Sequence, residues 1–304
     1  MNEQAAPIGN GTTLAVDRRR GLTRDEFRKE YFLTGTPVVL EGAAAEWGAV
    51  KKWSLEYLRQ VCGDDEVPVL DGQNWSANHD RAKEAVSTPE TTVKVRDLLT
   101  IVESGGAWYA PFLEILHRYP ILQQDIDYTF VRKYGCAHSW LPWQNNILSK
   151  MYIGGANTST SLHCAPVSNL FLQVHGRKKW TLIAPQFTPF MYTASNRGVN
   201  WQSRVDFRSP DNEKTPLYRY VTRYETILEP GDILWNPPLV WHGVINLTES
   251  IAVSMWWFNT TRAMRNNAFL TALSFGGIPG LVAKRLGIGQ KAKVKSNFQV
   301  HLNR

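Results

Sequence analysis

From residue 151 to residue 258 the chain consists of short runs rich in β-branched and aromatic residues, and this texture limits the fold more than any other feature. The clearest runs are residues 180–183, 233–235 and 251–257, and Gly, Pro and Asn residues punctuate the intervals between them. Short strands joined by such turns are typical of a β-sandwich or a small barrel. We therefore expect a mainly β domain whose core comes from this stretch.

The sequence before this region has helical character. The run Thr-Arg-Asp-Glu at residues 23–26 is a capping-box pattern and predicts the start of a helix. A short strand is predicted at residues 38–40, and amphipathic helices are predicted at residues 53–61 and 95–103. After the β region, residues 260–286 return to a helical pattern. Helical segments should therefore flank the β core on both sides.

These patterns divide the chain into four parts. We expect, in order, a flexible arm, a helix-and-strand N-terminal part, the β core with the functional site, and a C-terminal helical tail, at residues 1–20, 21–150, 151–258 and 259–304. The tail contains an apolar run at residues 269–275 that would be costly to expose to water. We therefore expect this tail to form a homodimer interface.

Composition and charge restrict the class of protein. The 304 residues are enough for one elaborated domain, and the hydrophobic fraction of 43% is ordinary for a globular protein. The chain opens without a signal-peptide pattern, has no apolar run long enough to cross a bilayer, and contains three widely spaced cysteines. We expect a soluble protein in the reducing cytoplasm.

The net charge of +7 admits an anionic partner. The basic residues form small clusters at residues 18–20, 177–179 and 284–295, and no nucleic-acid-binding motif surrounds them. A solvated basic surface is the better interpretation. We therefore expect neither nucleic acid nor a membrane as a partner.

Two histidines in the β region, His163 and His242, form a candidate metal site. In non-haem Fe(II) oxygenases two histidines and one Asp or Glu bind one face of the iron. The first histidine and the carboxylate lie two residues apart on a strand, so both point toward the metal. Here the triplet is His163-Cys164-Ala165, and Ala165 takes the position of the carboxylate. The alternative is a pair of core histidines that bind nothing.

Several motifs in a fixed order extend this pattern over most of the chain. They are the run from Thr160 to Ala165, Gly-Arg-Lys-Lys-Trp at residues 176–180, Gly-Thr-Pro-Val-Val-Leu at residues 35–40, and the segment from Glu229 to His242. In these motifs the chain resembles the JmjC and cupin-like Fe(II)/2-oxoglutarate oxygenases, and most of all the asparaginyl hydroxylase that inhibits hypoxia-inducible factor. The resemblance implies a mainly β double-stranded β-helix, or jelly roll, with N-terminal helices and a C-terminal helical extension.

The resemblance also implies roles for individual residues and the cofactors Fe(II), 2-oxoglutarate and O2. The two histidines match the iron ligands. Lys178 and Thr160 match the residues that bind the distal carboxylate of 2-oxoglutarate, Asn169 matches a polar residue near its keto-acid end, and Tyr109 resembles a further hydrogen-bond donor to it. The alternatives are a core aromatic at Tyr109 and a solvated lysine at Lys178. The second alternative is weaker, because the middle residue of an alternating run points opposite to its neighbours.

Ala165 is the departure from the family pattern, and three interpretations are open. In the radical halogenases the same His-x-Ala or His-x-Gly change is found, and chloride or bromide occupies the vacated position. This is our leading interpretation. The second is a hydroxylase with two histidines and water at the iron, and the third is a catalytically inactive binding protein. We do not expect Asp206, Glu229 or Asp232 to reach the iron, since Asp232 in Pro-Gly-Asp is more simply a turn residue.

The substrate is not fixed by these motifs. A small molecule, a peptide or a substrate tethered to an acidic carrier protein would each suit a basic enzyme of this fold. The segments 140–146 and 192–201 are predicted walls of the site. Trp241 and Trp256 are predicted to pack in the core.

Overall fold

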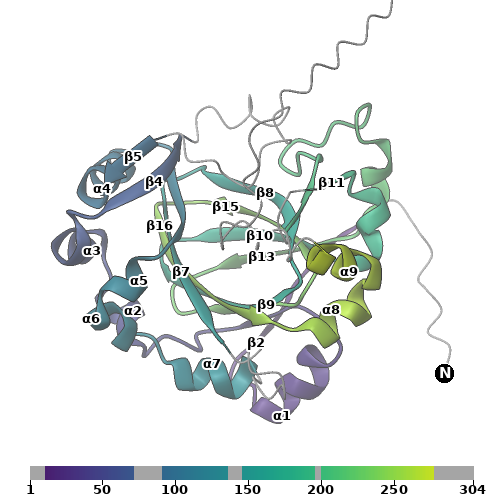
Figure 1. Cartoon of the computed structure of the whole chain (residues 1–304), viewed down its shortest axis with the longest axis horizontal. Helices are drawn as coiled ribbons and strands as arrows, with labels where there is room; N and C mark the ends of the chain where they lie inside the picture. Colours follow the sequence, from purple (N-terminus) through teal and green to yellow (C-terminus); the bar gives the residue numbers. More distant parts are fainter. Residues whose placement is uncertain (1–10, 72–90, 136–145, 196–199, 277–304) are drawn as a thin grey trace, which may run out of the picture.

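The computed structural model describes residues 11–71, 91–135, 146–195 and 200–276, and in these residues two β-sheets lie face to face (Figure 1). The smaller sheet has the strand order β1 (Thr13–Ala15), β13 (Arg223–Leu228), β10 (Lys178–Ile183), β15 (Trp241–Asn246), β8 (Ser159–Cys164), β12 (Trp201–Ser203) and β11 (Thr193–Ser195). The larger sheet has the strand order β2 (Asp17–Arg19), β3 (Val38–Leu40), β14 (Ile233–Asn236), β9 (Val167–His175), β16 (Ser250–Phe258), β7 (Leu148–Gly154), β6 (Trp108–Leu113), β4 (Glu66–Asp71) and β5 (Thr91–Lys94).

Short helices precede, interrupt and follow these strands. Those of the N-terminal half are α1 (Arg24–Glu26), the π-helix η1 (Phe27–Phe32), α2 (Gly48–Lys52), α3 (Leu55–Cys62), α4 (Val95–Glu103), α5 (Ile115–Arg118), α6 (Pro120–Gln124) and α7 (Tyr128–Gly135). Those of the C-terminal half are the 3-10 helices η5 (Pro185–Phe190) and η6 (Pro216–Tyr220), followed by α8 (Thr260–Asn266) and α9 (Ala268–Gly276). The mainly β, jelly-roll fold with helices at both ends is thus confirmed.

The central strands of the larger sheet, β14, β9 and β16, are buried on both faces, because helices cover one face and the smaller sheet covers the other. On β9, Leu170 and Leu172 pack with the helical N-terminal part, as does Trp235 on β14. Phe171, between the two leucines, points instead toward Trp180 of the smaller sheet, and their ring centroids lie 4.7 Å apart. Alternation along the strands therefore sends one set of side chains to the helices and the other into the barrel.

Most of the elements predicted from local patterns are present. The capping box at Thr23 and Glu26 forms as expected, with each side chain bonded to the other residue's backbone N–H. The helices predicted at residues 53–61 and 95–103 correspond to α3 and α4, and the predicted strand at residues 38–40 is β3. Local patterns were sufficient for these elements, because the two helices each have one apolar face against the core and β3 is a short apolar run buried on both faces.

The flexible arm expected over residues 1–20 is wrong for residues 13–19, while residues 1–10 lie outside the described part. β1 pairs in parallel with β13 at an edge of the smaller sheet, and β2 pairs in parallel with β3 at an edge of the larger sheet. Between them Val16 is buried and donates its N–H to the Glu225 carbonyl at 3.0 Å. Backbone pairing at a sheet edge needs no apolar pattern, so these strands leave little sign in the sequence.

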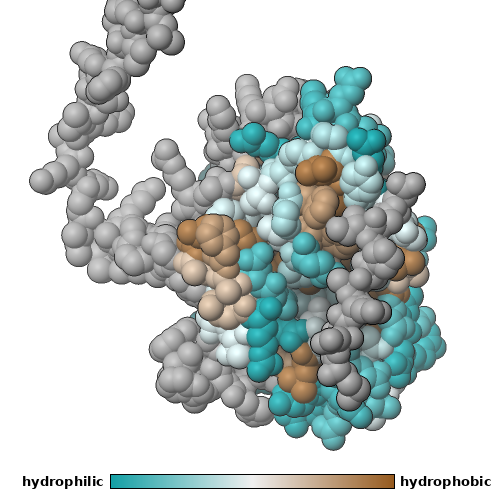
Figure 2. Space-filling view, turned by 90° about the vertical axis from the view of Figure 1, so that its right-hand side faces the viewer, coloured by the Kyte–Doolittle hydropathy of each residue, from teal (hydrophilic) through white to brown (hydrophobic). Residues whose placement is uncertain are grey.

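The predicted helical tail begins with α8 and α9, and its residues 277–286 lie outside the described part. Met264, Phe269 and Leu273 on these helices are 47%, 71% and 46% exposed. Figure 2, which faces this side of the molecule, shows brown apolar patches that interrupt the teal surface. In the residues described, none of the helices has both the length and the apolar character needed to cross a membrane.

Asp232 connects three segments at the turn before β14. Its Oδ1 accepts the Gly42 N–H at 2.9 Å, and its Oδ2 accepts the Glu229 N–H at 3.1 Å. The same Oδ2 forms an ion pair with Arg18 at 2.7 Å, although the Asp232 side chain is only 4% exposed. The carboxylate is therefore a structural residue of the turn, as its Pro-Gly-Asp context suggested.

We expect Asp232→Ala to lower the free energy of unfolding by about 3 kcal/mol, because two partly buried N–H groups lose their acceptor and Arg18 loses its carboxylate partner. Urea denaturation monitored by circular dichroism measures this change. The matched control is Glu229→Ala in the same turn, whose ion pair with Arg177 has both side chains about half exposed. That variant should lose less than about 1 kcal/mol. Equal losses in the two variants would contradict the assignment.

Candidate metal centre

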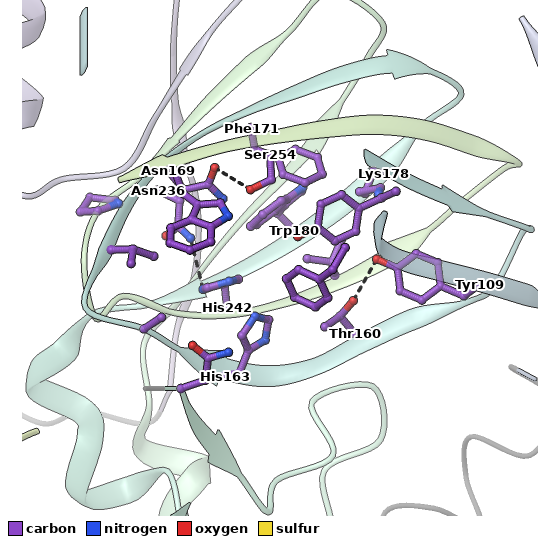
Figure 3. Close-up of a pocket in the computed structure, with 18 residues that line it drawn as sticks. Tyr109, Thr160, His163, Asn169, Phe171, Lys178, Trp180, Asn236, His242 and Ser254 are labelled. Atoms are coloured by element: carbon purple, nitrogen blue, oxygen red, sulfur yellow. Dashed lines mark hydrogen bonds between the residues drawn. The ribbon is translucent and has the colours of Figure 1, made fainter. Parts of the chain in front are cut away.

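Two neighbouring strands of the smaller sheet bring the candidate metal ligands together. β8 and β15 are antiparallel, and His163 and His242 are register partners in this pair. Opposite residues of such a pair point to the same face of the sheet. Here that face is the barrel interior, where the two ring centroids lie 4.1 Å apart (Figure 3). Two residues far apart in the sequence thus form one site.

Hydrogen bonds set the tautomer of both rings. His163 Nδ1 lies 2.8 Å from the Ser161 carbonyl oxygen, and His242 Nδ1 lies 2.9 Å from the Val240 carbonyl oxygen. A carbonyl oxygen only accepts, so Nδ1 carries the proton in each ring and the Nε2 lone pair is free. Asn236 Nδ2 lies 3.2 Å from the same His242 Nδ1, but the Val240 carbonyl is nearer and only accepts, so it decides the tautomer. This arrangement, with Nδ1 anchored and Nε2 free, is the one found in metal-bound histidines.

Burial keeps the two imidazoles neutral. It lowers the pKa of His163, and burial together with the neighbouring His163 lowers the pKa of His242 well below its ordinary value. Trp180 stacks on the His242 ring, with centroids 5.5 Å apart and planes inclined by 23°. Neutral imidazole is the form that binds iron. The residues present therefore fit a metal held by two Nε2 atoms.

Where the sequence predicts the place of a third metal ligand, the chain has the methyl group of Ala165. Ala165 follows β8 and lines the same cavity as the histidines, and its carbonyl accepts the Leu239 N–H at 2.8 Å. Leu239 has a φ of 61°, a left-handed conformation that is uncommon for a residue with a branched side chain. Within residues 11–276, apart from the undescribed gaps, no group of three His, Cys, Asp or Glu residues could hold a metal ion.

The acidic residues considered from the sequence are engaged elsewhere. Asp232 holds the turn before β14, Glu229 pairs with Arg177, and Asp206 accepts the Arg208 N–H at 3.0 Å. None of the three lines the cavity. These three residues therefore supply no carboxylate to the described cavity.

One cavity of about 350 Å³ contains the histidines and the other candidate residues. All the residues that the sequence singled out for the site line it: Tyr109, Thr160, His163, Ala165, Asn169, Lys178 and His242. They come from strands of both sheets and from the residue after β8. The fold thus brings together what the sequence spreads over more than a hundred residues, although the iron and co-substrate roles of these residues stay predictions.

Lys178 lies at the opposite end of this cavity from the histidines (Figure 3). It is 1% exposed, and no carboxylate of the described residues pairs with it. Its Nζ lies over the rings of Phe171 and Tyr152, at 5.0 and 5.7 Å from their centroids. Burial lowers the pKa of Lys178 to about 7. A buried ammonium without a counter-ion is costly, so this end of the cavity suits an anionic ligand.

Neutral hydrogen-bonding groups accompany the lysine. Thr160 Oγ1 donates to the Tyr109 hydroxyl at 3.3 Å, and burial raises the pKa of Tyr109 to about 12. Asn169 Oδ1 accepts from Ser254 Oγ at 3.1 Å, which fixes the amide and leaves its N–H groups for a ligand. These groups add donors to the cavity without adding charge.

The structure also places residues in the cavity that sequence reasoning missed or misplaced. Trp241 packs in the core as expected, but Trp256 lines the cavity. Asn200 lines it as well, within the wall predicted at residues 192–201. Asn236 also lines the cavity and was not predicted from the sequence. The available signal was a polar residue at the end of the apolar run Ile-Leu-Trp, directly before Pro-Pro. Of the other predicted wall, residues 140–145 lie outside the described part.

The comparison with known families agrees with this geometry. A family model described as a cupin-like domain matches residues 24–263. The chain belongs to the cupin-like domain family. The matched stretch contains every strand from β3 to β16, and therefore both histidines and the whole described cavity of this cupin-like domain.

Several curated proteins are similar to this chain. Jumonji C domain-containing protein 5 of Drosophila melanogaster is 31% identical over 241 residues, which are 77% of this chain and 57% of that protein. Lysine-specific demethylase JMJ30 of Arabidopsis thaliana is 32% identical over 258 residues, 83% of this chain and 57% of that protein. The chain thus spans little more than half the length of these two. tRNA wybutosine-synthesizing protein 5 of Homo sapiens is 25% identical over 270 residues, 81% and 79% of the two chains.

These relatives support the JmjC and cupin part of the resemblance. They do not support its finer part, the likeness to the asparaginyl hydroxylase, nor a halogenase motif. The chain is therefore assigned at the level of the superfamily, and the names of these relatives do not fix its reaction.

We expect Lys178→Met to raise the free energy of unfolding of the ligand-free protein by about 1–4 kcal/mol at pH 6, because it replaces an uncompensated buried cation by an apolar group of similar shape. The pKa of Lys178 is about 7 in the folded chain against an ordinary value of 10.5. Between these values the unfolded chain holds more protons, so the stability of the wild type rises with pH and the advantage of the variant shrinks. Urea denaturation from pH 6 to pH 10 measures both effects.

Lys179→Met is the matched control for this experiment. Lys179 points away from the cavity, is half-buried, and pairs with Glu225 at 2.8 Å. Its loss should change stability by less than about 1 kcal/mol, without the pH dependence of the Lys178 variant. A Lys178→Met protein no more stable than the wild type at pH 6 would show that the lysine has a counter-ion.

Proposed function

We propose that this protein is an Fe(II)/2-oxoglutarate-dependent oxidative enzyme, and specifically a halogenase of an unactivated C–H bond, in which chloride or bromide takes the place of the missing carboxylate ligand. One observation carries the proposal. A single cavity has two neutral imidazoles with free Nε2 atoms at one end and a buried, unpaired ammonium at the other, and a methyl group stands beside the imidazoles.

Each of these residues suits one part of the iron and co-substrate complex. The histidines would hold Fe(II) through Nε2, and the ammonium of Lys178 suits the distal carboxylate of 2-oxoglutarate. The hydroxyls of Thr160 and Tyr109 lie on the same side of the cavity as Lys178, and because Thr160 donates to Tyr109, the Tyr109 O–H is left as a neutral donor (Figure 3). The free N–H groups of Asn169 suit the keto-acid end. When bound, Fe(II) with 2-oxoglutarate and O2 supplies an oxidant that removes a hydrogen atom from a C–H bond.

Charge balance in the cavity favours an anion beside Ala165. Fe(II) would bring two positive charges and Lys178 one, whereas 2-oxoglutarate brings two negative charges. The imidazoles are neutral, and no carboxylate lines the described part of the cavity. One positive charge is therefore left over in a buried site, where it is costly. A halide removes this excess and a water molecule does not.

Two other functions share the same residues. A hydroxylase with a two-histidine iron would keep water beside Ala165, and an inactive binding protein would hold a ligand without turnover. The excess charge disfavours the first. The second gives no physical reason to keep a buried cation facing two metal-binding imidazoles. Both alternatives are distinguishable outcomes of the experiment below.

For the substrate we propose a neutral group of a small molecule, a peptide or a carrier-tethered chain. Two of the relatives are named for lysine demethylation and for tRNA wybutosine synthesis. The described lining has no carboxylate to pair with a lysine ammonium, and Val167, Pro237 and Trp256 give its wall an apolar character. We therefore do not extend the lysine substrate to this chain.

Anaerobic titration with Fe(II) and 2-oxoglutarate, with and without chloride, tests the proposal. We expect the visible charge-transfer band of the iron-chelated keto acid, and a chloride-dependent change in its position or in the apparent affinity. A band that ignores chloride would favour the hydroxylase. The absence of any band in the wild type would leave a binding protein. His163→Ala is the negative control and should abolish the band.

Ala165→Asp tests the vacated position in the same assay. Because the new carboxylate supplies the missing negative charge and occupies the halide space, the band should persist and lose its response to chloride. Product analysis should show hydroxylation or no turnover in place of halogenation. A chloride response that survives this substitution would rule out the proposed position.

We also propose a homodimer formed through α8 and α9, since Phe269 is 71% exposed next to Leu273 at 46%. Light scattering of the wild type should give twice the 34.5 kDa mass of the chain. Phe269→Glu should give the monomer mass, because it places a charge in the apolar contact. Ile121→Glu, an equally apolar and 50% exposed position on α6, should stay dimeric. A monomeric wild type would refute the proposal.

A further inference from the structure

Asn200 and Ala165 each lie one residue beyond the paired ends of β12 and β8. In the pairing of β12 with β8, Trp201 is the partner of Cys164 and Gln202 is the partner of His163. If this antiparallel register is extended by one residue, Asn200 comes opposite Ala165. Opposite residues share a face of the sheet, with Cβ atoms about 5 Å apart. Asn200 therefore points to the same side as the position that Ala165 leaves open.

The cavity lining agrees with this register. Asn200 and Ala165 both line the cavity that holds the histidines. Trp201, the next residue, points away, since its indole N–H donates to Ser274 Oγ at 2.8 Å. Alternation along the strand thus directs Asn200 inward and Trp201 outward.

Asn200 differs from the other amides of the cavity in its hydrogen bonding. The other amides of the described lining are engaged, because Asn169 accepts from Ser254 and Asn236 lies against His242. The side chain of Asn200 makes no hydrogen bond to any residue in the described part of the chain, and it is half-buried at the edge of the cavity. Its amide brings two N–H donors that a ligand in the cavity can use.

We propose that Asn200 is an anion-binding residue, whose side-chain N–H donates to the anion that takes the position left by Ala165. This inference rests on the proposed function, because it needs an exogenous anion at the iron. A neutral amide suits a halide, because it offers N–H donors without the repulsion that a carboxylate would exert. The amide could also bind a water molecule, because it has both a donor and an acceptor. The preference for an anion comes from the charge of the cavity, and the amide N–H supplies a hydrogen bond to that anion.

The test is the apparent dissociation constant of chloride, measured from the charge-transfer band of the anaerobic complex of Fe(II) and 2-oxoglutarate with the full chain. A hydrogen bond to a charged group is lost in Asn200→Ala, so we expect chloride to bind about tenfold or more weakly. The concentration of 2-oxoglutarate that half-saturates the band should not change, because Lys178 is untouched. Asn212→Ala, an exposed asparagine outside the cavity, is the matched control and should bind chloride as the wild type does.

Asn200→Asp is the second variant, and it changes the volume of the side chain very little. Its carboxylate should remove the chloride response, while the band itself persists. Unchanged chloride affinity in Asn200→Ala, beside a normal response in the wild type, would overturn the role of Asn200 alone. So would equal losses of chloride and 2-oxoglutarate affinity, which indicate a general structural effect. A wild type without a chloride response would overturn the proposed halide position, and the role of Asn200 with it.

Discussion

The antiparallel pairing of β8 with β15 is the constraint on which the rest of the site depends. In this register the two histidines face each other, whereas a slip by one residue would turn one of them to the outside of the barrel. Hydrogen bonds fix the register on both sides of the pair: the Leu239 N–H binds the Ala165 carbonyl, and the Asn246 N–H binds the Thr158 carbonyl, each at 2.8 Å. The register is irregular just after the second histidine, between His242 and Val244. The residue there is Gly243, and the ring of Phe207 lies so close that a Cβ at this position would have no space.

A second constraint is that the barrel encloses charge without balancing it. The described cavity has a buried ammonium and two imidazoles that burial holds neutral, and its carboxylate position carries a methyl group. Such an interior is complete only with anionic ligands. The arrangement explains why the same jelly roll serves different reactions: the scaffold fixes positions, and the charges placed at those positions decide what binds.

The sequence predicted the features that follow from local patterns. Alternation alone separated an inward Lys178 from an outward Lys179, and the structure has the first at 1% exposure and the second paired with a surface glutamate. The mainly β core was readable for the same reason. In contrast, the strands at residues 13–19 and the pairing of β12 with β8, which brings Asn200 near Ala165, depend on which segments meet across a sheet. Neither partner of such a pair carries a signal of the other, so a single sequence does not reveal it.

The burial of Lys178 has a consequence for the lifetime of the protein under the function proposed above. A dicarboxylate that neutralises the ammonium would bind the folded chain and not the unfolded one, so occupancy would lower the fraction of chains that are open to proteases. With the ligand scarce, the ligand-free chain would keep the cost of its buried cation and would be degraded faster. The abundance of the protein would then follow the metabolic state of the cell without any dedicated regulator.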